Sequence, residues 1–222
     1  MRLLSLSILF VLFWNLSFSQ VQEISLQGKL LSEIKSAAKS KSSFRISFSQ
    51  EKLYGKTSIE KDGISYTSIW LKGTYPNGEV GEPNLPVYKK LIRIPKGSKP
   101  TIKVVSYNQQ IINLKDAGLS AVVRPNQPSV RKDQDSLSIK FYKNEKSYIN
   151  KSLDNAPTAK VEILGTLRSA TIARVVVNPV DYNPGDGSIK IFNDIDVDIT
   201  FDKTESFDAK TYSPYFESTY NS

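Results

Sequence analysis

The sequence predicts an all-β fold, a single β-sandwich or barrel-like domain with little helix. Apolar and polar residues alternate in many short segments, as at Phe44, Ile46 and Phe48, which is the period of a strand with one buried face. Turns containing glycine or proline separate these segments, and apolar spacing of helical period is almost absent. Many short strands joined by tight turns are typical of sandwiches and barrels.

A series of segments has the composition of strands. In chain order, the predicted strands are residues 44–48, 64–66, 69–71, 87–94, 102–107, 111–114, 119–123, 137–141, 161–177 and 188–201. Turn residues separate several of them, at Asp62-Gly63, Pro76-Asn-Gly78 and Pro184-Gly-Asp-Gly187, because glycine, proline and asparagine suit the backbone angles of tight turns.

The strand at 87–94 has the clearest boundaries. Pro83 and Pro86 fix their own φ and favour extended geometry in the residues before them, whereas Pro95 and Gly97 end the strand. Its alternate residues form one apolar face and one mixed face, so we expect a sheet that is covered on one side.

The chain divides into four parts. Residues 1–19 combine a cationic start, an apolar run and small residues before Gln20, and they predict a signal peptide. Residues 20–43 predict a flexible lead-in, although apolar residues between Ile24 and Ile34 have a spacing compatible with a short helix. Residues 44–203 form the predicted β-rich domain. Residues 204–222 are polar with interspersed aromatic rings and predict a linker.

Composition excludes several kinds of site. The chain contains no histidine and no cysteine, so a Ser-His-Asp triad, a Cys-His dyad and ordinary zinc ligation are all excluded. We therefore predict a non-catalytic protein with no cofactor and no metal. The formal net charge is +8, but lysine and arginine are dispersed among acidic residues, which does not favour nucleic acid as a partner.

Two features of the chain resemble functional sites and have simpler interpretations. Asp194, Asp196 and Asp198 alternate with apolar residues, so they predict a strand with one wet face rather than a calcium loop. Residues 143–160 have no strand pattern and predict a long exposed loop, on which lie Lys143, Lys146 and Lys151. Loops of that length are usually functional or disordered.

Two motifs carry a resemblance to a known family. The first is a Gly-x-Pro-x-Leu-Pro run that leads into a strand ending in Ile-Pro. The second is an apolar strand, a Pro-x-x-Tyr-Asn-Pro corner and an alternating closing strand. The residues of the two motifs are Gly81, Pro83, Leu85, Pro86, Ile94 and Pro95, then Pro179, Tyr182, Asn183 and Pro184. With this order and spacing, the chain from about residue 44 to 203 resembles the propeptide of gingipain-type cysteine peptidases of Bacteroidetes.

The resemblance implies a function as well as a fold. Such propeptides are β-rich domains of zymogens exported through the periplasm by type IX secretion to the cell surface or the medium. They cover the cleft of the catalytic domain, keep it latent and assist its folding. In arginine- and lysine-specific members, a basic residue on a propeptide loop enters the acidic specificity pocket. By relative position we expect that residue to be Lys146, with Lys143 and Lys151 as alternatives.

The resemblance also implies a partner. It is a cysteine peptidase catalytic domain, either downstream of residues 204–222 in the same precursor or in a separate chain. No nucleic acid is implied, nor any membrane after signal cleavage. An alternative of a different class is an exported β-sandwich adhesin or glycan-binding module, with Trp70, Tyr66 and Tyr75 as its stacking rings.

Overall fold

The computed structural model describes residues 20–29, 33–40, 42–135, 139–153, 155–167 and 170–203. The predicted signal peptide and the predicted linker lie outside the described residues. Twelve strands and one short 3-10 helix make up the described secondary structure: β1 (Gln22–Ser25), β2 (Glu33–Ser40), β3 (Ser43–Ser49), β4 (Lys52–Ile59), β5 (Ser65–Leu71), β6 (Tyr75–Asn77), β7 (Leu85–Ile94), β8 (Pro100–Asn113), η1 (Glu145–Tyr148), β9 (Thr158–Leu167), β10 (Ala170–Asn178), β11 (Val180–Asn183) and β12 (Ser188–Phe201).

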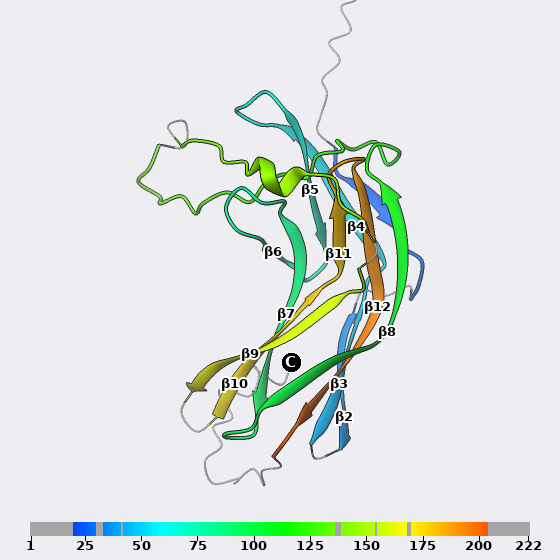
Figure 1. Ribbon diagram of the computed structural model, residues 1–222, viewed down its shortest axis with the longest axis vertical. Coiled ribbons are helices and arrows are strands. Elements are labelled where there is room, and N and C mark those ends of the chain that lie inside the picture. Colours follow the sequence, from blue (N-terminus) through cyan, green and yellow to red (C-terminus); the bar gives the residue numbers. More distant parts are fainter. Residues whose placement is uncertain are drawn as a thin grey trace, which may run out of the picture.

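The strands form three antiparallel sheets. One has the order β6-β7-β10-β9 and a second the order β1-β4-β5. In the third, β12 pairs with β11 and β3, β3 pairs with β2, and β8 pairs with β12. Figure 1 shows β7, β9 and β10 on one side of the molecule, with β12, β8, β3 and β2 on the other. The prediction of an all-β domain with little helix is confirmed.

The core lies between the sheets. Phe48 of β3 stacks on Tyr88 of β7, with their ring centroids 4.7 Å apart, so this contact joins the two large sheets directly. Around it, the alternating residues of the predicted strands are buried, among them Ile46, Val175 and Val197. Burial of these aliphatic side chains supplies the main stabilisation of a domain that has no disulfide.

The prediction for residues 20–43 is wrong where the structure describes them. This part of the chain contains β1, which pairs with β4, and β2, which pairs with β3. Most of β2 is exposed and consists of Ser, Ala and Lys. An edge strand of this composition is held by backbone hydrogen bonds and buries little, so it has no hydrophobic period to detect.

Other differences concern strand boundaries. Residues 102–107 and 111–114 belong almost entirely to one continuous strand, β8, and residues 161–177 belong to two strands, β9 and β10. Residues 119–123 and 139–141 are not strands, although Leu119 and Val123 are buried in the core. The sequence does not predict the strands β4, β6 and β11. Short length accounts for β6 and β11, while Gly55, which packs beneath Leu119, interrupts the apolar pattern of β4.

Replacement of Ile46 by alanine is expected to reduce the free energy of unfolding by about 2–5 kcal/mol, because it removes methyl groups from a closed core. Ile46 is 0% exposed, whereas Ile111 is 63% exposed. The matched control Ile111→Ala should change the free energy of unfolding by less than about 0.5 kcal/mol. Urea denaturation of both variants measures the difference, and equal losses would contradict this description of the core.

Candidate functional site: a basic loop held by the sheets

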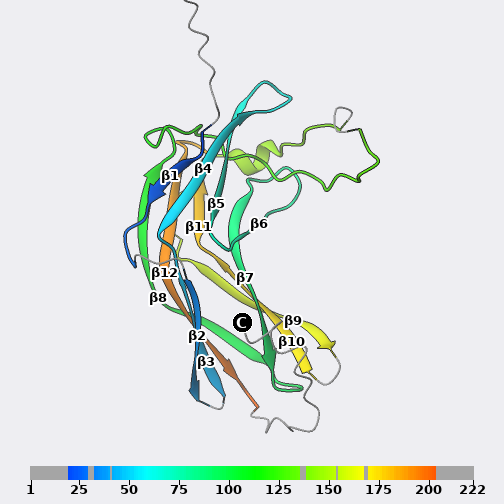
Figure 2. The same ribbon diagram turned by 180° about the vertical axis from the view of Figure 1, so that it is seen from behind.

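A long excursion joins β8 to β9. Residues 114–157 contain no strand among those that the structure describes, and their only helix there is η1. Figures 1 and 2 show the excursion at one end of the sandwich, where part of it extends away from the body. We call residues 127–135 and 139–142 the projecting loop, and residues 143–153 the clamped segment.

The first motif fixes the clamped segment at Gly81. The carbonyl of Gly81 accepts a hydrogen bond of 2.9 Å from the N–H of Asn144, and the N–H of Gly81 donates to the carbonyl of Asn126 at 2.8 Å. Gly81 has φ of +89°, and a Cβ atom there would lie 2.9 Å from the backbone nitrogen of Asn144. Glycine is therefore required by both conformation and space.

The second motif fixes the same excursion at other points. The Tyr182 hydroxyl donates to the carbonyl of Ala121 at 2.9 Å and accepts from the N–H of Val123 at 3.2 Å. The carbonyl of Val123 accepts a hydrogen bond of 2.7 Å from the Tyr148 hydroxyl. Next to Tyr182, the side-chain oxygen of Asn183 accepts from the N–H of Lys151 at 3.1 Å. Both tyrosine hydroxyls thus form hydrogen bonds with backbone groups that have no backbone hydrogen-bond partner in a described strand.

The prolines of the motifs shape the strands around this joint. Pro86 is buried in β7 opposite Pro76 of the three-residue strand β6, and the carbonyl of Pro179 accepts a hydrogen bond from the N–H of Phe192 at 2.7 Å. Leu85, Pro83 and Pro184 line the cleft described below. Pro95 follows the last residue of β7 and accepts a hydrogen bond from Ser98 in the turn towards β8.

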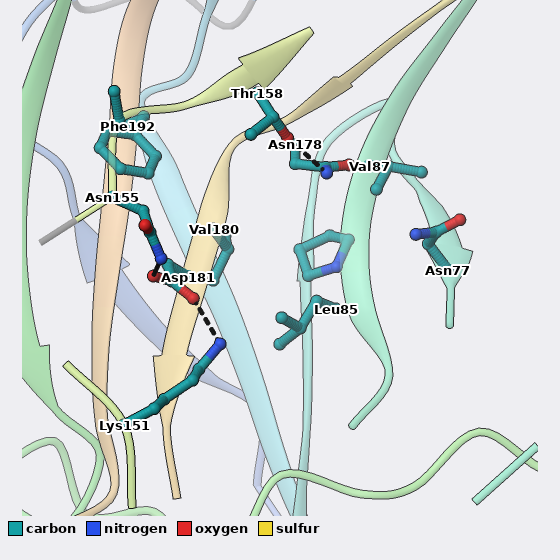
Figure 3. A pocket seen from close by; sticks show the side chains of 12 residues that line it. Asn77, Leu85, Val87, Lys151, Asn155, Thr158, Asn178, Val180, Asp181 and Phe192 are labelled. Atoms are coloured by element: carbon teal, nitrogen blue, oxygen red, sulfur yellow. Dashed lines mark hydrogen bonds and ion pairs between the residues drawn. The ribbon is translucent and has the colours of Figure 1, made fainter. Parts of the chain in front are cut away.

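A cleft separates the clamped segment from β6 and β7. It has a volume of about 400 Å³, and its walls include Glu82, Leu85, Lys146 and Tyr182. A neighbouring cavity of about 250 Å³ is drawn in Figure 3. There the ammonium of Lys151 lies 2.7 Å from Asp181, and the amide of Asn155 donates to the same carboxylate at 3.2 Å. These polar groups are satisfied by one another, so this cavity is a structural joint between loop and sheet.

The three predicted lysines differ in the ion pairs that they form in the structure. Lys143 forms an ion pair of 2.9 Å with Glu145 and lies over the ring of Tyr148, and its side chain is only 20% exposed. Lys151 is paired with Asp181. Lys146 is exposed, and its ammonium has no carboxylate partner among the described residues. Of the three, Lys146 alone presents an uncommitted charge.

The projecting loop carries three basic residues that sequence reasoning missed, Arg131, Lys132 and Lys140. Arg131 pairs with its exposed neighbour Asp133, through a hydrogen bond of 3.1 Å. The base of the loop is closed because Gln127 exchanges two hydrogen bonds with the backbone of Tyr142, at 2.8 and 3.0 Å. The sequence contains a signal for this part of the site, the two adjacent basic residues Arg131 and Lys132. It was missed because the strand predicted at 137–141 divided the region that forms the loop.

Comparisons with known proteins identify the family. Residues 28–215 match the family model described as Propeptide_C25. The chain belongs to this propeptide family. It is therefore a gingipain-type propeptide and not a catalytic domain.

Relatives and solved structures agree with this assignment. Lys-gingipain from Porphyromonas gingivalis is 34% identical over 170 residues, which is 74% of this chain and 10% of the relative. The propeptide thus spans about a tenth of the length of the curated relatives it matches. A structure concerning the zymogenic latency of gingipain K from P. gingivalis has a TM-score of 0.74 and 31% identity, and covers 82% of this chain and 98% of that one. The complex of the P. gingivalis RgpB pro- and mature domains has a TM-score of 0.67 and covers 85% of this chain and 96% of that one. At 16% identity, this likeness shows the fold alone.

The glycan-binding alternative does not fit the position of its rings. Tyr66 is fully buried, and its hydroxyl donates to Asp62 at 2.6 Å. Trp70 stacks on Tyr54 with the ring centroids 5.8 Å apart. Only Tyr75 of the three predicted rings is among the exposed residues. The prediction of a shared stacking platform is therefore wrong.

The acidic series on β12 is a wet strand face, as predicted. Arg45 donates to the carboxylate of Asp198 at 2.7 and 3.0 Å, and Lys39 contacts the same carboxylate. These two cations hold the pKa of Asp198 well below its usual range. Within the described ranges, no group of three or more acidic residues could hold a metal ion.

Gly81→Ala is expected to lower the free energy of unfolding by about 2–4 kcal/mol, since it combines left-handed strain with a backbone clash at Asn144. Gly63 is a matched control, because it has φ of +76° and no atom lies within 4 Å of the position that a Cβ would take there. Gly63→Ala introduces only the left-handed strain, so it should lower the free energy of unfolding by about 1–2 kcal/mol. Trypsin should cleave the Gly81→Ala variant faster within residues 143–151 than the control variant. Identical cleavage rates would argue against the clamp.

The joint is expected to weaken at alkaline pH. Burial raises the pKa of both Tyr148 and Tyr182 above the ordinary value of 10.0. The unfolded chain then loses these protons first, so their stabilisation is complete below about pH 10 and decreases as the pH rises above it. Urea denaturation from pH 8 to pH 11 should show a smaller loss for a Tyr148→Phe/Tyr182→Phe variant than for the wild type. Parallel pH profiles would contradict this role of the hydroxyls.

Proposed function

We propose that this propeptide folds with, covers and inhibits a gingipain-type cysteine peptidase catalytic domain and keeps it latent during export. Family membership supports this function, and so does the likeness to the gingipain K structure. The observation that carries the proposal is the excursion between β8 and β9. Two separate motifs fix it to the sandwich, while its uncommitted basic side chains lie outside.

A fixed loop is the physical requirement for such an inhibitor. A loop already ordered in the free propeptide loses little conformational entropy on binding, which improves affinity. A lysine or arginine that enters an acidic, desolvated pocket also makes a charge-assisted contact, stronger than a neutral one. The rigid base opposes the movement that a bound substrate needs in order to be cleaved and released.

The anchoring residue is proposed to be one whose charge is free. Lys146 stays our first choice among the three predicted lysines, because Lys143 and Lys151 are held in ion pairs within the propeptide. The projecting loop adds Lys132 as a competing candidate, since Lys132 is exposed and stands next to the Arg131–Asp133 pair.

Export is part of the same proposal. We expect residues 1–19 to act as a signal peptide, so that the precursor passes through the periplasm by type IX secretion and reaches the cell surface or medium. The described part of the chain has no helix with the length and apolarity needed to cross a membrane.

Inhibition of mature Lys-gingipain by residues 20–222 tests this function. Wild-type propeptide should inhibit it, and alanine replacement of the anchoring residue should raise the inhibition constant about 30-fold or more, the usual effect of losing a buried charged anchor. Lys146→Ala and Lys132→Ala are compared with Lys115→Ala, which removes an exposed lysine from a turn at the other end of the excursion. Inhibition unchanged by Lys146→Ala would remove Lys146 as the anchor. Absence of inhibition by the wild type would contradict the function itself.

A further inference from the structure

The strand β9 leaves one edge of the four-stranded sheet open. It pairs with β10 along Thr158–Leu167, and no described strand is hydrogen-bonded to its other edge. An open edge presents unpaired backbone N–H and C=O groups, which form a template for another strand. Figures 1 and 2 show the ends of β9 and β10 extending from the body.

The end of β9 is also apolar. Ile163, Leu164 and Leu167 are 53%, 51% and 47% exposed, and we call these three residues the hairpin end. A bulge lies among them, because Gly165 pairs with Ile172 and Ile163 with Ala173, so that Leu164 has no partner in the register. Single exposed aliphatic residues are common on protein surfaces, but three within five residues on an open edge form a patch.

Another open edge, that of β2, is protected, and this contrast is informative. β2 ends the five-stranded sheet, and its exposed residues are Ser36, Ala37, Ala38, Ser40 and the two lysines Lys35 and Lys39. Small side chains and lysines are the usual means of preventing edge association. In β9 the only charged residues, Lys160 and Glu162, form an ion pair of 2.6 Å before the hairpin end begins, and Glu162 also pairs with Arg174 of β10.

The position of the hairpin end indicates what covers it. In Figures 1 and 2 it extends to the same side of the molecule as the projecting loop. The last described residues also lie close to this end. Thr171 of β10 pairs with Ile94 of β7, and in the turn that follows β7 the N–H of Lys99 donates to Asp202 at 2.6 Å. A domain that follows Lys203 in a precursor and reaches the projecting loop would therefore pass the hairpin end.

We propose that the hairpin end is a second docking surface for the peptidase catalytic domain, which contributes an apolar patch and an open strand edge there. The inference rests on the proposed function and extends it, because it assigns affinity to a surface remote from the basic residues. Two separated contacts on one rigid body bind more tightly than either alone, since the second contact forms without further loss of translational freedom.

The test uses the triple variant Ile163→Ser/Leu164→Ser/Leu167→Ser of residues 20–222, with mature Lys-gingipain as the probe. Inhibition should weaken at least about tenfold, because apolar residues at an interface centre carry much of its affinity. The control Val21→Ser/Ile111→Ser removes two aliphatic side chains elsewhere, which are 41% and 63% exposed, and should inhibit like the wild type. Hydrogen exchange of the wild-type complex gives an independent readout, with slower exchange expected in residues 161–167.

The outcomes separate this inference from the function on which it rests. If the wild type does not inhibit, both fail. If the wild type and the triple variant inhibit equally and exchange in residues 161–167 is unchanged, only the docking surface is overturned. If the free propeptide is a dimer that the triple variant converts to a monomer without loss of inhibition, a second copy occupies the surface and the inference is also overturned. Should the triple variant fail to fold, the exchange measurement on the wild type decides alone.

Discussion

The pairing of β12 on both of its edges is the constraint on which the rest of this propeptide depends. One edge of its 14 residues pairs with β8, and the other pairs first with β11 and then with β3. The inward residues, including Ile191, Ile195 and Val197, are buried in the core. Because β11 is fixed to β12, the positions of Tyr182 and Asn183 are fixed as well. The sheet thereby determines where the basic loop lies.

The two family motifs have one structural task, although they lie far apart in the sequence. Gly81 binds Asn144 and Asn126, whereas Tyr182 binds the backbone of Ala121 and Val123. Both therefore hold the excursion that joins β8 to β9. A loop of this length without strands would ordinarily have many backbone groups to satisfy and a large entropy of ordering. The motif residues form hydrogen bonds with some of these backbone groups and restrict the conformations of the loop. This explains how a long irregular segment is held in one conformation.

The sequence was sufficient to predict the strands that alternate and are buried on one face, such as β3, β7 and β12. It did not reveal β1 and β2, whose order depends on backbone pairing with distant partners rather than on side-chain pattern. For the site, the position of the clamped segment and its lysines could be predicted. Their ion pairs could not, because Asp181 reaches Lys151 only through the fold. The strand predicted at 137–141, of which residues 139–141 are not a strand, also hid the projecting loop.

The basic character of the chain acquires a different meaning once these pairs are known. Arg45 and Lys39 are bound to Asp198, Arg124 to Glu60, and Arg174 to Glu162, so part of the positive charge is used within the domain. Such exposed or half-exposed pairs contribute little stability individually, but a cation that is held in one of them is not free to pair with a partner. Selection of an acidic pocket would then depend on where a free side chain is presented and not on the net charge of +8. A rigid loop base is what makes that placement reproducible from molecule to molecule, and this is why the clamp and the proposed anchor belong to one mechanism.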